Sequence, residues 1–433
     1  MEYKKRIADA ILELKLEAFG ATLITGPKGC GKTTTGKQKA ASVVEFQDED
    51  VRENLLAVAQ TQPSRLLIGK KPRLFDEWQD APKIWGAVRK SVDDEQKTGL
   101  YILTGSTSQT VDTPHTGTQR ISTLKMYPMS LYESGESNGE VSLSALFDKP
   151  EAFQGCHSDL TVEQIIWAIC RGGWPRAINN EIPRAQLEIA KDLFYQTCHI
   201  DISNIDGTRR NPLFAEALLR SYSRNLCTLA EIQTIRKDVL SVAGTLSEST
   251  LYDYLTALKQ LFVIEDVPAW SPAIRSKSAI RAGNKRCFTD PSMAVAALGL
   301  KPEYFNTDFK TLGFLFEALC IRDLRIYSSK SDGRVSYYHD RYGLEADAVL
   351  HLADGRYALI EIKLGSHEIN YGAKHLVKLE NLIRGKNATE TQVPLALPTL
   401  KIVLTGTEYG YRRDDGVWLA EEKSNKLVMM VEN

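Results

Sequence analysis

The segment GPKGCGKTTT, residues 26–35, combines glycines, a lysine and threonines at a spacing that suits phosphate binding. Its three glycines allow a tight turn that points backbone N–H groups at phosphate oxygens. Lys32 would bring a cation to the β- and γ-phosphates, and the Thr33 hydroxyl could bind Mg²⁺. We therefore predict a site for ATP and Mg²⁺. The predicted loop residues are Gly26, Pro27, Lys28, Gly29, Cys30, Gly31, Lys32, Thr33 and Thr34.

A nucleotide site also needs an acid at the end of a neighbouring strand, and PRLFDEWQ, residues 72–79, supplies two. Asp76 is predicted to hold Mg²⁺ through water, and Glu77 to orient or deprotonate the attacking water. The alternative is an exposed acidic pair that merely ends a strand.

Two further positions are candidates for contact with the phosphates. The strand YILTG, residues 101–105, ends in small polar residues, so Thr104 or Ser106 could sense the γ-phosphate. A plain strand-to-loop turn explains them equally well. Arg120 could reach a phosphate in its own subunit or in a neighbouring one, unless it is a solvated loop residue.

Near the other end of the chain, residues 343–365 read as two strands that carry charges. If residues 353–355 form a three-residue turn with glycine in the left-handed conformation, this turn fixes which residues of the two strands lie opposite each other. Asp347 then lies opposite Glu361, and Glu345 opposite Lys363, on one face of the sheet. Since two carboxylates at that spacing repel, a cation or a proton is expected between them.

Paired strand carboxylates with a lysine suit metal-assisted cleavage of phosphodiesters. Asp347 and Glu361 would hold Mg²⁺, and Lys363 would orient water or stabilise developing charge. Glu317, an acid in an apolar helical stretch, could complete the cluster. The competing interpretation is a salt-bridged hairpin in which Lys363 pairs with Glu345, without catalysis.

The elements that position these residues follow from the hydrophobic pattern. Short apolar segments alternate with helical ones up to residue 135, which predicts an α/β domain with a parallel sheet. Residues 158–265 are mostly helical, and residues 300–433 return to mixed strand and helix. We place domain boundaries near residues 135 and 290, giving domains 1–135, 136–290 and 291–433.

The middle domain contains two predicted helices and a short strand, an order typical of a winged helix. Ser247 is the predicted N-cap of the second helix. Its outward face, with Tyr252 and Lys259, is only weakly basic, so both packing and DNA contact stay open. The segment 275–286 carries five basic residues and no acid, and is either a nucleic-acid contact or a solvated loop.

Several segments together resemble a prokaryotic AAA+-like ATPase family: GPKGCGKTTT, LFDEWQDAP, ILTGSTS, QRISTLKMYPMSLYE, GGWPRAI and, further on, FTDPSMAVAALG and LGFLFEAL. The family carries a C-terminal domain similar to PD-(D/E)xK nucleases, with a restriction-endonuclease-like α/β fold. The resemblance implies that Glu317, Asp347, Glu361 and Lys363 match its E…D…ExK core.

Composition limits the remaining possibilities. The formal net charge of −1 gives no overall attraction to nucleic acid, so any such contact needs a local patch. The seven cysteines lack CxxC spacing, and with no signal peptide or apolar span we expect reduced thiols, a cytoplasmic location and no membrane partner. Two functions remain: an ATPase that controls a Mg²⁺-dependent nuclease acting on DNA, or a nucleotide-switched regulatory protein whose C-terminal domain binds a protein partner.

Overall fold

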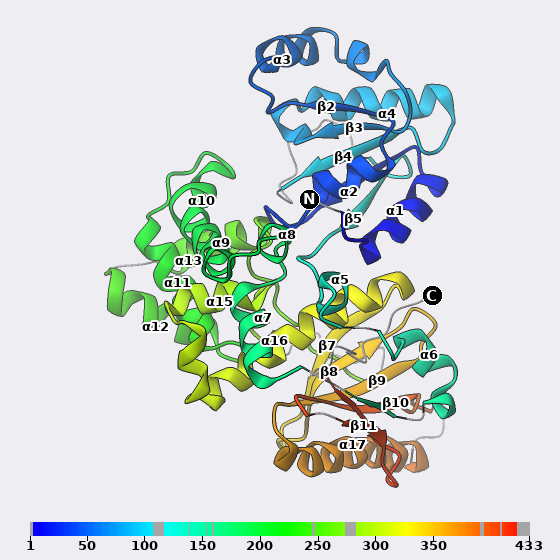
Figure 1. The fold of residues 1–433 in the computed structure, drawn as a ribbon, viewed down its shortest axis with the longest axis vertical. Helices are drawn as coiled ribbons and strands as arrows, with labels where there is room; N and C mark the ends of the chain where they lie inside the picture. The colour runs from blue at the N-terminus through cyan, green and yellow to red at the C-terminus, as the bar shows by residue number, and fades with distance from the viewer. Residues whose placement is uncertain are drawn as a thin grey trace. The chain divides into compact units, whose positions relative to one another are not determined.

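The computed structural model folds into two compact units, each assembled from separate stretches of sequence (Figure 1). The first unit comprises Met1–Pro128, Asp201–Arg209 and Leu255–Val263, and the second comprises Met129–Ile200, Arg210–Tyr254 and Ile264–Asn433. The three-part division at residues 135 and 290 stays a prediction. The residues described are 3–106, 117–137, 139–153, 155–157, 160–244, 247–272, 283–389, 394–407 and 409–421.

The first unit is built on a five-stranded parallel sheet with strand order β2-β3-β4-β1-β5. Successive side chains along each strand point to opposite faces of the sheet, so each face buries its own cluster of apolar side chains. Its elements are α1 (Ile7–Ala18), β1 (Ala21–Thr25), α2 (Lys32–Lys39), β2 (Ser42–Glu45), α3 (Arg52–Thr61), β3 (Arg73–Asp76), α4 (Lys83–Glu95), β4 (Tyr101–Gly105), β5 (Ile121–Lys125) and the short α10 (Ile202–Asn204).

The two faces of this sheet are covered by different helices. On one face Phe75 and Leu103 pack with Val88 of α4. On the other, Ile24 and Ile102 pack with residues of α1. The parallel α/β architecture predicted for the N-terminal region is therefore present, and the loops at the carboxyl ends of its strands share one edge.

The second unit contains a helical part and a seven-stranded mixed sheet with strand order β6-β11-β12-β10-β9-β8-β7. The helices are α5 (Leu131–Ser134), α6 (Leu143–Asp148), α7 (Val162–Arg171), α8 (Pro175–Ile178), α9 (Pro183–Gln196), α11 (Pro212–Arg224), α12 (Ile232–Ala243), α15 (Pro291–Leu298), α16 (Phe309–Ser328) and α17 (Ile369–Thr389). The strands are β6 (Cys156–His157), β7 (Arg334–His339), β8 (Glu345–His351), β9 (Tyr357–Lys363), β10 (Leu400–Thr405), β11 (Tyr409–Arg412) and β12 (Trp418–Glu421).

Two long helices flank this second sheet, α17 on one face and α16 on the other (Figure 1). Val349 and Leu359 of the sheet pack with Leu376 and Leu379 of α17 in one buried cluster. α16 contacts β7, β8 and β9.

None of the described helices is long and apolar enough to cross a membrane.

The two helices predicted for the middle of the chain are present, and isolated bridges follow them in place of the predicted short strand. α12 is followed by α13 (Glu248–Gln260), whose N-cap is Ser247, since its hydroxyl accepts a hydrogen bond from the Thr250 N–H at 3.1 Å. Antiparallel bridges then pair Ile264 with Phe288 and Val267 with Lys285. The winged-helix assignment and its contact with DNA stay predictions.

The basic segment 275–286 is only partly described, and that part differs from the prediction. Arg275, Lys277 and Arg281 lie outside the described residues. Lys285 and Arg286 are buried and paired with Glu317 and Asp266 rather than presented to solvent. Acids from other elements neutralise them, which a local pattern of charges could not reveal.

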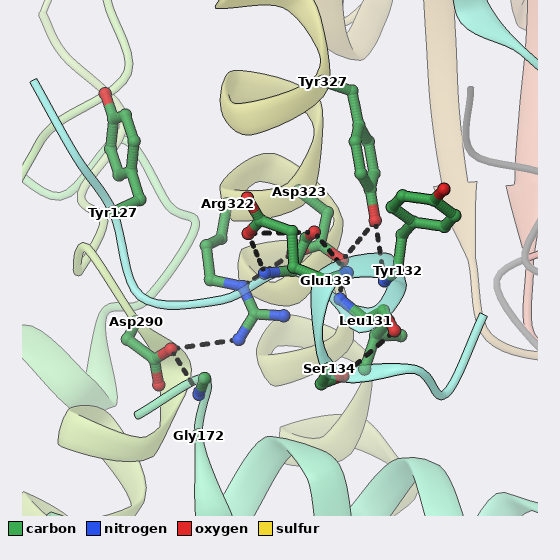
Figure 2. Close-up of polar contacts among 12 residues, drawn as sticks. Tyr127, Leu131, Tyr132, Glu133, Ser134, Gly172, Asp290, Arg322, Asp323 and Tyr327 are labelled. Carbon is green, nitrogen blue, oxygen red and sulfur yellow. Dashed lines mark hydrogen bonds and ion pairs between the residues drawn. The ribbon is translucent and has the colours of Figure 1, made fainter. Parts of the chain in front are cut away.

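A buried ionic network ties together four parts of the second unit (Figure 2). The Arg322 guanidinium of α16 lies 3.0 Å from Asp290 and 2.6 Å from Asp323, and all three side chains are essentially inaccessible. Asp323 also accepts the Leu131 N–H at 3.0 Å, and Asp290 accepts the Gly173 N–H at 3.0 Å. The network therefore fixes α5 and the α7–α8 connection against α15 and α16.

Candidate functional site

The loop between β1 and α2 has the backbone conformation that its glycines predict. Gly26, Gly29 and Gly31 have φ values of 149°, 80° and 104°, and Gly31 is the N-cap of α2. A Cβ atom on Gly26 would lie 2.3 Å from the Met126 carbonyl oxygen, so only glycine fits there. The Lys32 ammonium donates to the carbonyls of Gly26 and Pro27 at 3.0 Å each, which curls the loop around it.

Asp76 lies at the centre of a hydrogen-bonded group at the carboxyl edge of the parallel sheet. Its Oδ1 accepts hydrogen bonds from the hydroxyls of Thr33 and Thr104, each at 2.6 Å. Asp76 ends β3, Thr104 belongs to β4 and Thr33 to the first turn of α2. Three elements therefore bring a carboxylate and two hydroxyls together beside the glycine-rich loop.

Glu77 adopts a left-handed backbone conformation with φ 51°, which is unusual for a residue other than glycine. Its N–H donates to the Thr104 hydroxyl at 3.2 Å. Its carboxylate accepts hydrogen bonds from the Gln79 amide and, at 3.3 Å, from the Ser106 hydroxyl. Thr104 and Ser106 were predicted as alternative sensors of the γ-phosphate. In the structure Thr104 contacts Asp76 and the Glu77 N–H, and Ser106 contacts the Glu77 carboxylate.

Two other charged residues contact the glycine-rich loop. Lys28 forms an ion pair at 3.2 Å with Asp201, which belongs to the same compact unit although it is distant in sequence. Arg6 is buried and donates to the carbonyls of Cys30, at 2.9 Å, and Tyr127, at 2.8 Å. Sequence reasoning missed Arg6, because the basic start of an amphipathic helix gives no signal of this contact.

Arg120 lies at the opposite edge of the sheet from the loop. It directly precedes β5, whose first residue Ile121 pairs with Ala21 at the start of β1. The loop begins beyond Thr25, about 13 Å further along the strands. Arg120 instead donates to Asp93 of α4 at 2.7 Å. This position lies away from the glycine-rich loop of the same chain, and a contact of Arg120 with a phosphate, in its own subunit or a neighbouring one, stays a prediction.

The charged hairpin has the predicted register. The Leu352 N–H donates to the Arg356 carbonyl at 2.9 Å, and Gly355 has φ 90°. Pairing then runs to Ala348 opposite Ile360, which makes Asp347 and Glu361 the next residues along the two strands. Asp347 departs from the ladder, because its Oδ2 accepts the Ile362 N–H at 2.8 Å.

Lys363 joins the two hairpin carboxylates. Its ammonium lies 3.0 Å from Asp347 Oδ2 and 2.6 Å from Glu361 Oε2. These distances show that both acids face the same side of the sheet. Lys363 therefore pairs with Asp347 and Glu361 and not with Glu345, which the salt-bridge alternative had named.

Glu317 reaches this cluster through a second lysine. The Lys285 ammonium lies 2.6 Å from Glu317 Oε1 on α16 and 3.1 Å from the Asp347 carbonyl oxygen. It is also 3.9 Å from Asp347 Oδ1. Burial raises the pKa of Glu317 to about 7, although the nearby Lys285 opposes that shift. Sequence reasoning placed Lys285 in a basic surface segment and missed this role.

Glu361 is the most deeply buried acid of the cluster. Its side chain is inaccessible, and burial together with the charge of Asp347 raises its pKa to about 9. Burial also disfavours ionisation of Asp347, but Lys285 and Lys363 outweigh it and lower the pKa of that carboxyl. His375 of α17, another residue that sequence reasoning missed, has its Nδ1 3.5 Å from Glu361 Oε1.

Four residues of this cluster, Lys285, Glu317, Asp347 and Lys363, line a cavity of about 480 Å³ in the second unit, and Glu361 lies behind them outside its lining. Aromatic rings of α16 and β7, including Phe309 and Tyr338, line the same cavity. Its charged lining residues are Lys285, Lys310, Lys363, Glu317, Glu345, Asp347 and Glu368, with His339.

Three segments of the chain match models of known domain families. Residues 18–135 match the AAA domain family. This part of the chain is AAA-like, and we refer to it as the AAA domain. Residues 162–304 and 312–421 match two domains of unknown function, DUF8612 and DUF4143. No curated protein matches the chain.

Two solved structures show limited similarity to the chain. The Walker-type ATPase PABY2304 of Pyrococcus abyssi is 17% identical, with 67% of this chain and 94% of that chain covered and a TM-score of 0.41. RuvB of Thermotoga maritima is also 17% identical, with 60% and 89% covered and a TM-score of 0.28.

The geometry of the AAA domain fits a bound nucleotide with Mg²⁺. The glycine-rich loop leads into the N-terminus of α2, where backbone N–H groups would suit phosphate oxygens, and the Lys32 ammonium lies within the loop. Thr33 and Asp76 are the hydroxyl and carboxylate that Mg²⁺ commonly contacts, directly or through water. Their side chains are already hydrogen-bonded to each other.

The cavity in the second unit fits Mg²⁺ better than a metal that needs a full set of protein ligands. Within the described residues, no group of three or more His, Cys, Asp or Glu side chains is placed to hold a metal ion. Mg²⁺ is usually held by one or two carboxylates, with waters and substrate phosphates completing its shell. Glu361 Oε2 lies 2.6 Å from the Lys363 ammonium, whereas its Oε1 has no hydrogen-bond partner within the described residues, so Oε1 and Asp347 can offer such ligands.

Proposed function

We propose that the AAA domain hydrolyses ATP. Lys32 would bind the β- and γ-phosphates, and Thr33 with Asp76 would hold Mg²⁺, which withdraws charge from the phosphates when bound. Glu77 would orient and deprotonate the attacking water. The observation that carries this proposal is the group of hydrogen bonds in which Thr33 and Thr104 both donate to Asp76 at 2.6 Å, while Thr104 also fixes the backbone of Glu77.

The test separates binding from turnover. Lys32→Ala should abolish binding of a fluorescent ATP analogue, because it removes the ammonium around which the loop curls and which would bind the β- and γ-phosphates. Glu77→Gln should keep that binding and slow phosphate release by about 10²-fold or more, the range for loss of a general base. Glu53→Gln, an exposed acid of α3, is the matched control and should behave like the wild type. Equal turnover in Glu77→Gln and wild type would remove Glu77 from catalysis.

A second activity is favoured by the cluster in the second unit. We propose that Asp347, Glu361, Lys363 and Glu317 form a Mg²⁺-dependent nuclease site, whose activity follows the nucleotide state of the AAA domain. Bound Mg²⁺ would polarise a phosphodiester and lower the pKa of water. Lys363, held 2.6 Å and 3.0 Å from the two carboxylates, is positioned to stabilise developing charge on the phosphate.

The competing candidate is a regulatory protein whose second unit binds a partner and performs no chemistry. One observation favours it: the Lys285 ammonium pairs with Glu317 and approaches Asp347. Two lysines then balance much of the negative charge that a metal ion would otherwise neutralise. A buried cluster of this kind can serve structure alone.

A nuclease panel distinguishes the two candidates. Single-stranded and duplex DNA and RNA would be incubated with the full chain and Mg²⁺, with and without ATP. The nuclease proposal expects cleavage that falls at least 10²-fold in Glu361→Gln and in Lys363→Met. Glu380→Gln, on α17 and paired with Lys401 away from the cavity, is the control and should cleave normally. Absence of cleavage on every substrate, with ATP hydrolysis intact, would favour the regulatory protein.

A further inference from the structure

The cavity beside Asp347 also indicates what kind of substrate could reach it. The acids lie well below the surface: Glu361 is inaccessible, and Asp347 and Glu317 are each 8% exposed. With a volume of about 480 Å³, the cavity has room for little more than one or two nucleotides. We propose that this cavity admits a single strand of nucleic acid and excludes a duplex. This inference rests on the proposed nuclease site.

The burial of the acids is the first argument. Phosphates of a duplex are attached to a stiff helix, with a persistence length of about 150 base pairs, so they meet only groups near a protein surface. Enzymes that act on buried or extruded nucleotides use single-stranded or flipped substrate for this reason. A flexible single strand can bend its backbone down to Asp347 and Lys363, whereas an intact duplex cannot.

Aromatic side chains at the cavity supply the second argument. Phe309, the first residue of α16, is 58% exposed yet lines the cavity. Tyr338 of β7 lines it as well and is half-buried against Trp270. Unstacked bases gain about 1–3 kcal/mol each by stacking on such rings, whatever their sequence. Bases within a duplex are already stacked and offer no face to Phe309.

Charge supplies the third argument and a further condition. The cavity is lined by three lysines and four carboxylates, so it carries one net negative charge before His339 is counted. That balance repels a phosphate backbone. One Mg²⁺ ion held by Asp347 and an ionised Glu361 would cancel this negative charge, and the exposed Lys310 beside Phe309 could then hold the next phosphate. Strand binding should therefore need a divalent cation as well as Phe309.

The experiment measures binding separately from cleavage. Fluorescence anisotropy of labelled single-stranded DNA, single-stranded RNA and duplex DNA of equal length would be recorded with the full chain in Ca²⁺, in Mg²⁺ and in EDTA. We expect a single strand to bind at least tenfold more tightly than duplex, and its affinity to fall at least tenfold in EDTA. Comparison of single-stranded DNA with single-stranded RNA shows whether the cavity prefers deoxyribose or ribose. A preference for either single strand over duplex supports the inference.

Variants then test the cavity itself. Phe309→Ala should lower affinity for the single strand by about tenfold, which corresponds to about 1.4 kcal/mol. Phe309→Trp, which keeps a stacking surface, should restore it. Tyr409→Ala removes a similarly exposed aromatic side chain, 59% exposed, from β11, outside the cavity, and should leave affinity unchanged. Thermal unfolding of all three variants, compared with the wild type, shows whether the second unit is folded.

The outcomes separate this inference from the nuclease proposal. Duplex bound and cleaved as well as a single strand, or a single strand bound normally by Phe309→Ala, would overturn the inference and leave the nuclease proposal standing. Tight single-strand binding without cleavage would refute the nuclease and keep the cavity as a strand-binding site. Binding of neither form would refute both.

Discussion

Lys71 illustrates how a single side chain can lower stability at neutral pH. It precedes β3 in the first unit and lines a second cavity, of about 1000 Å³, with its ammonium 3.6 Å from the centre of the Tyr101 ring. Burial lowers its pKa to about 8, although Glu95 partly opposes the shift. The cavity contains none of the residues predicted to bind ATP.

We predict that Lys71→Met stabilises the protein at pH 7. In the unfolded chain a lysine has a pKa of about 10.4, so between pH 8 and 10.4 the unfolded state binds more protons than the folded state. The cost of the buried charge is thus fully present below pH 8 and disappears above pH 10.4. Since Lys71 is only half-buried, solvent screening reduces the expected gain to about 1 kcal/mol.

The measurement is the difference in melting temperature between wild type and Lys71→Met at pH 7 and at pH 10. Lys90→Met, at an exposed position of the same cavity, provides the control and should show no such trend. A difference that is the same at both pH values would mean that protonation of Lys71 does not control it.

For single residues, the sequence predicted a position correctly where the residue belongs to a short local motif. The glycine-rich loop and the acids after β3 come from short segments whose backbone largely determines their geometry. It failed where a partner comes from a distant segment. Lys285 pairs with an acid 32 positions away and Arg6 with a carbonyl 121 positions away, and neither pairing leaves a trace in local charge.

Among the elements of the second unit, α16 depends on the buried Arg322 shown in Figure 2. The guanidinium is held between Asp290 and Asp323, and these acids in turn accept N–H groups of the 129–136 and 171–174 segments. Burial alone would lower the pKa of Arg322, but the two acids raise it, so it stays charged at any physiological pH. Removing the arginine would leave two buried carboxylates unpaired.

We predict that Arg322→Met destabilises the second unit by about 3–5 kcal/mol, the usual cost of breaking a buried ion pair from one side. Urea unfolding followed by tryptophan fluorescence would measure the change, and Trp174 within this region reports on it. Arg224→Met removes an exposed arginine that pairs with Asp238, and should cost less than about 1 kcal/mol. Similar losses in the two variants would show that the network does not hold these elements.

The hairpin shows that the register of an element can be predicted when its turn is identified. The turn at residues 353–355 determined which side chains face each other, and the pairing of Ala348 with Ile360 confirms it. The cation between Glu317 and Asp347 could not be predicted in this way. Lys285 enters from the 264–288 bridges and Glu317 from α16, and only tertiary packing brings them to β8.

For the whole molecule, the division into units could not be read from the order of the sequence. Residues 201–209 and 255–263 are far along the chain from the AAA domain, yet they group with it in the first unit. Composition and hydrophobic pattern change little at these positions, and contacts of long sequence separation decide the grouping. The ion pair of Lys28 with Asp201 is one such contact.

This contact gives a prediction for the response of the chain to ATP. Lys28 belongs to the glycine-rich loop, and its side chain is 57% exposed while paired with Asp201. An exposed pair of this kind is worth at most about 1 kcal/mol, whereas a triphosphate beside the loop attracts the same ammonium with a larger charge. ATP should therefore draw Lys28 away from Asp201 and loosen residues 202–209.

Hydrogen exchange measured with and without a non-hydrolysable ATP analogue would test this expectation. Amides of residues 202–209 should exchange several-fold faster with the analogue in the wild type, because the ion pair no longer restrains that segment. In Asp201→Asn they should exchange fast in both states, while Lys191→Met, which breaks an exposed pair with Glu188 elsewhere in the chain, should respond like the wild type. If the exchange of residues 202–209 slows or stays constant when the analogue binds, the nucleotide does not act through Lys28, since competition for its ammonium can only weaken the contact with Asp201.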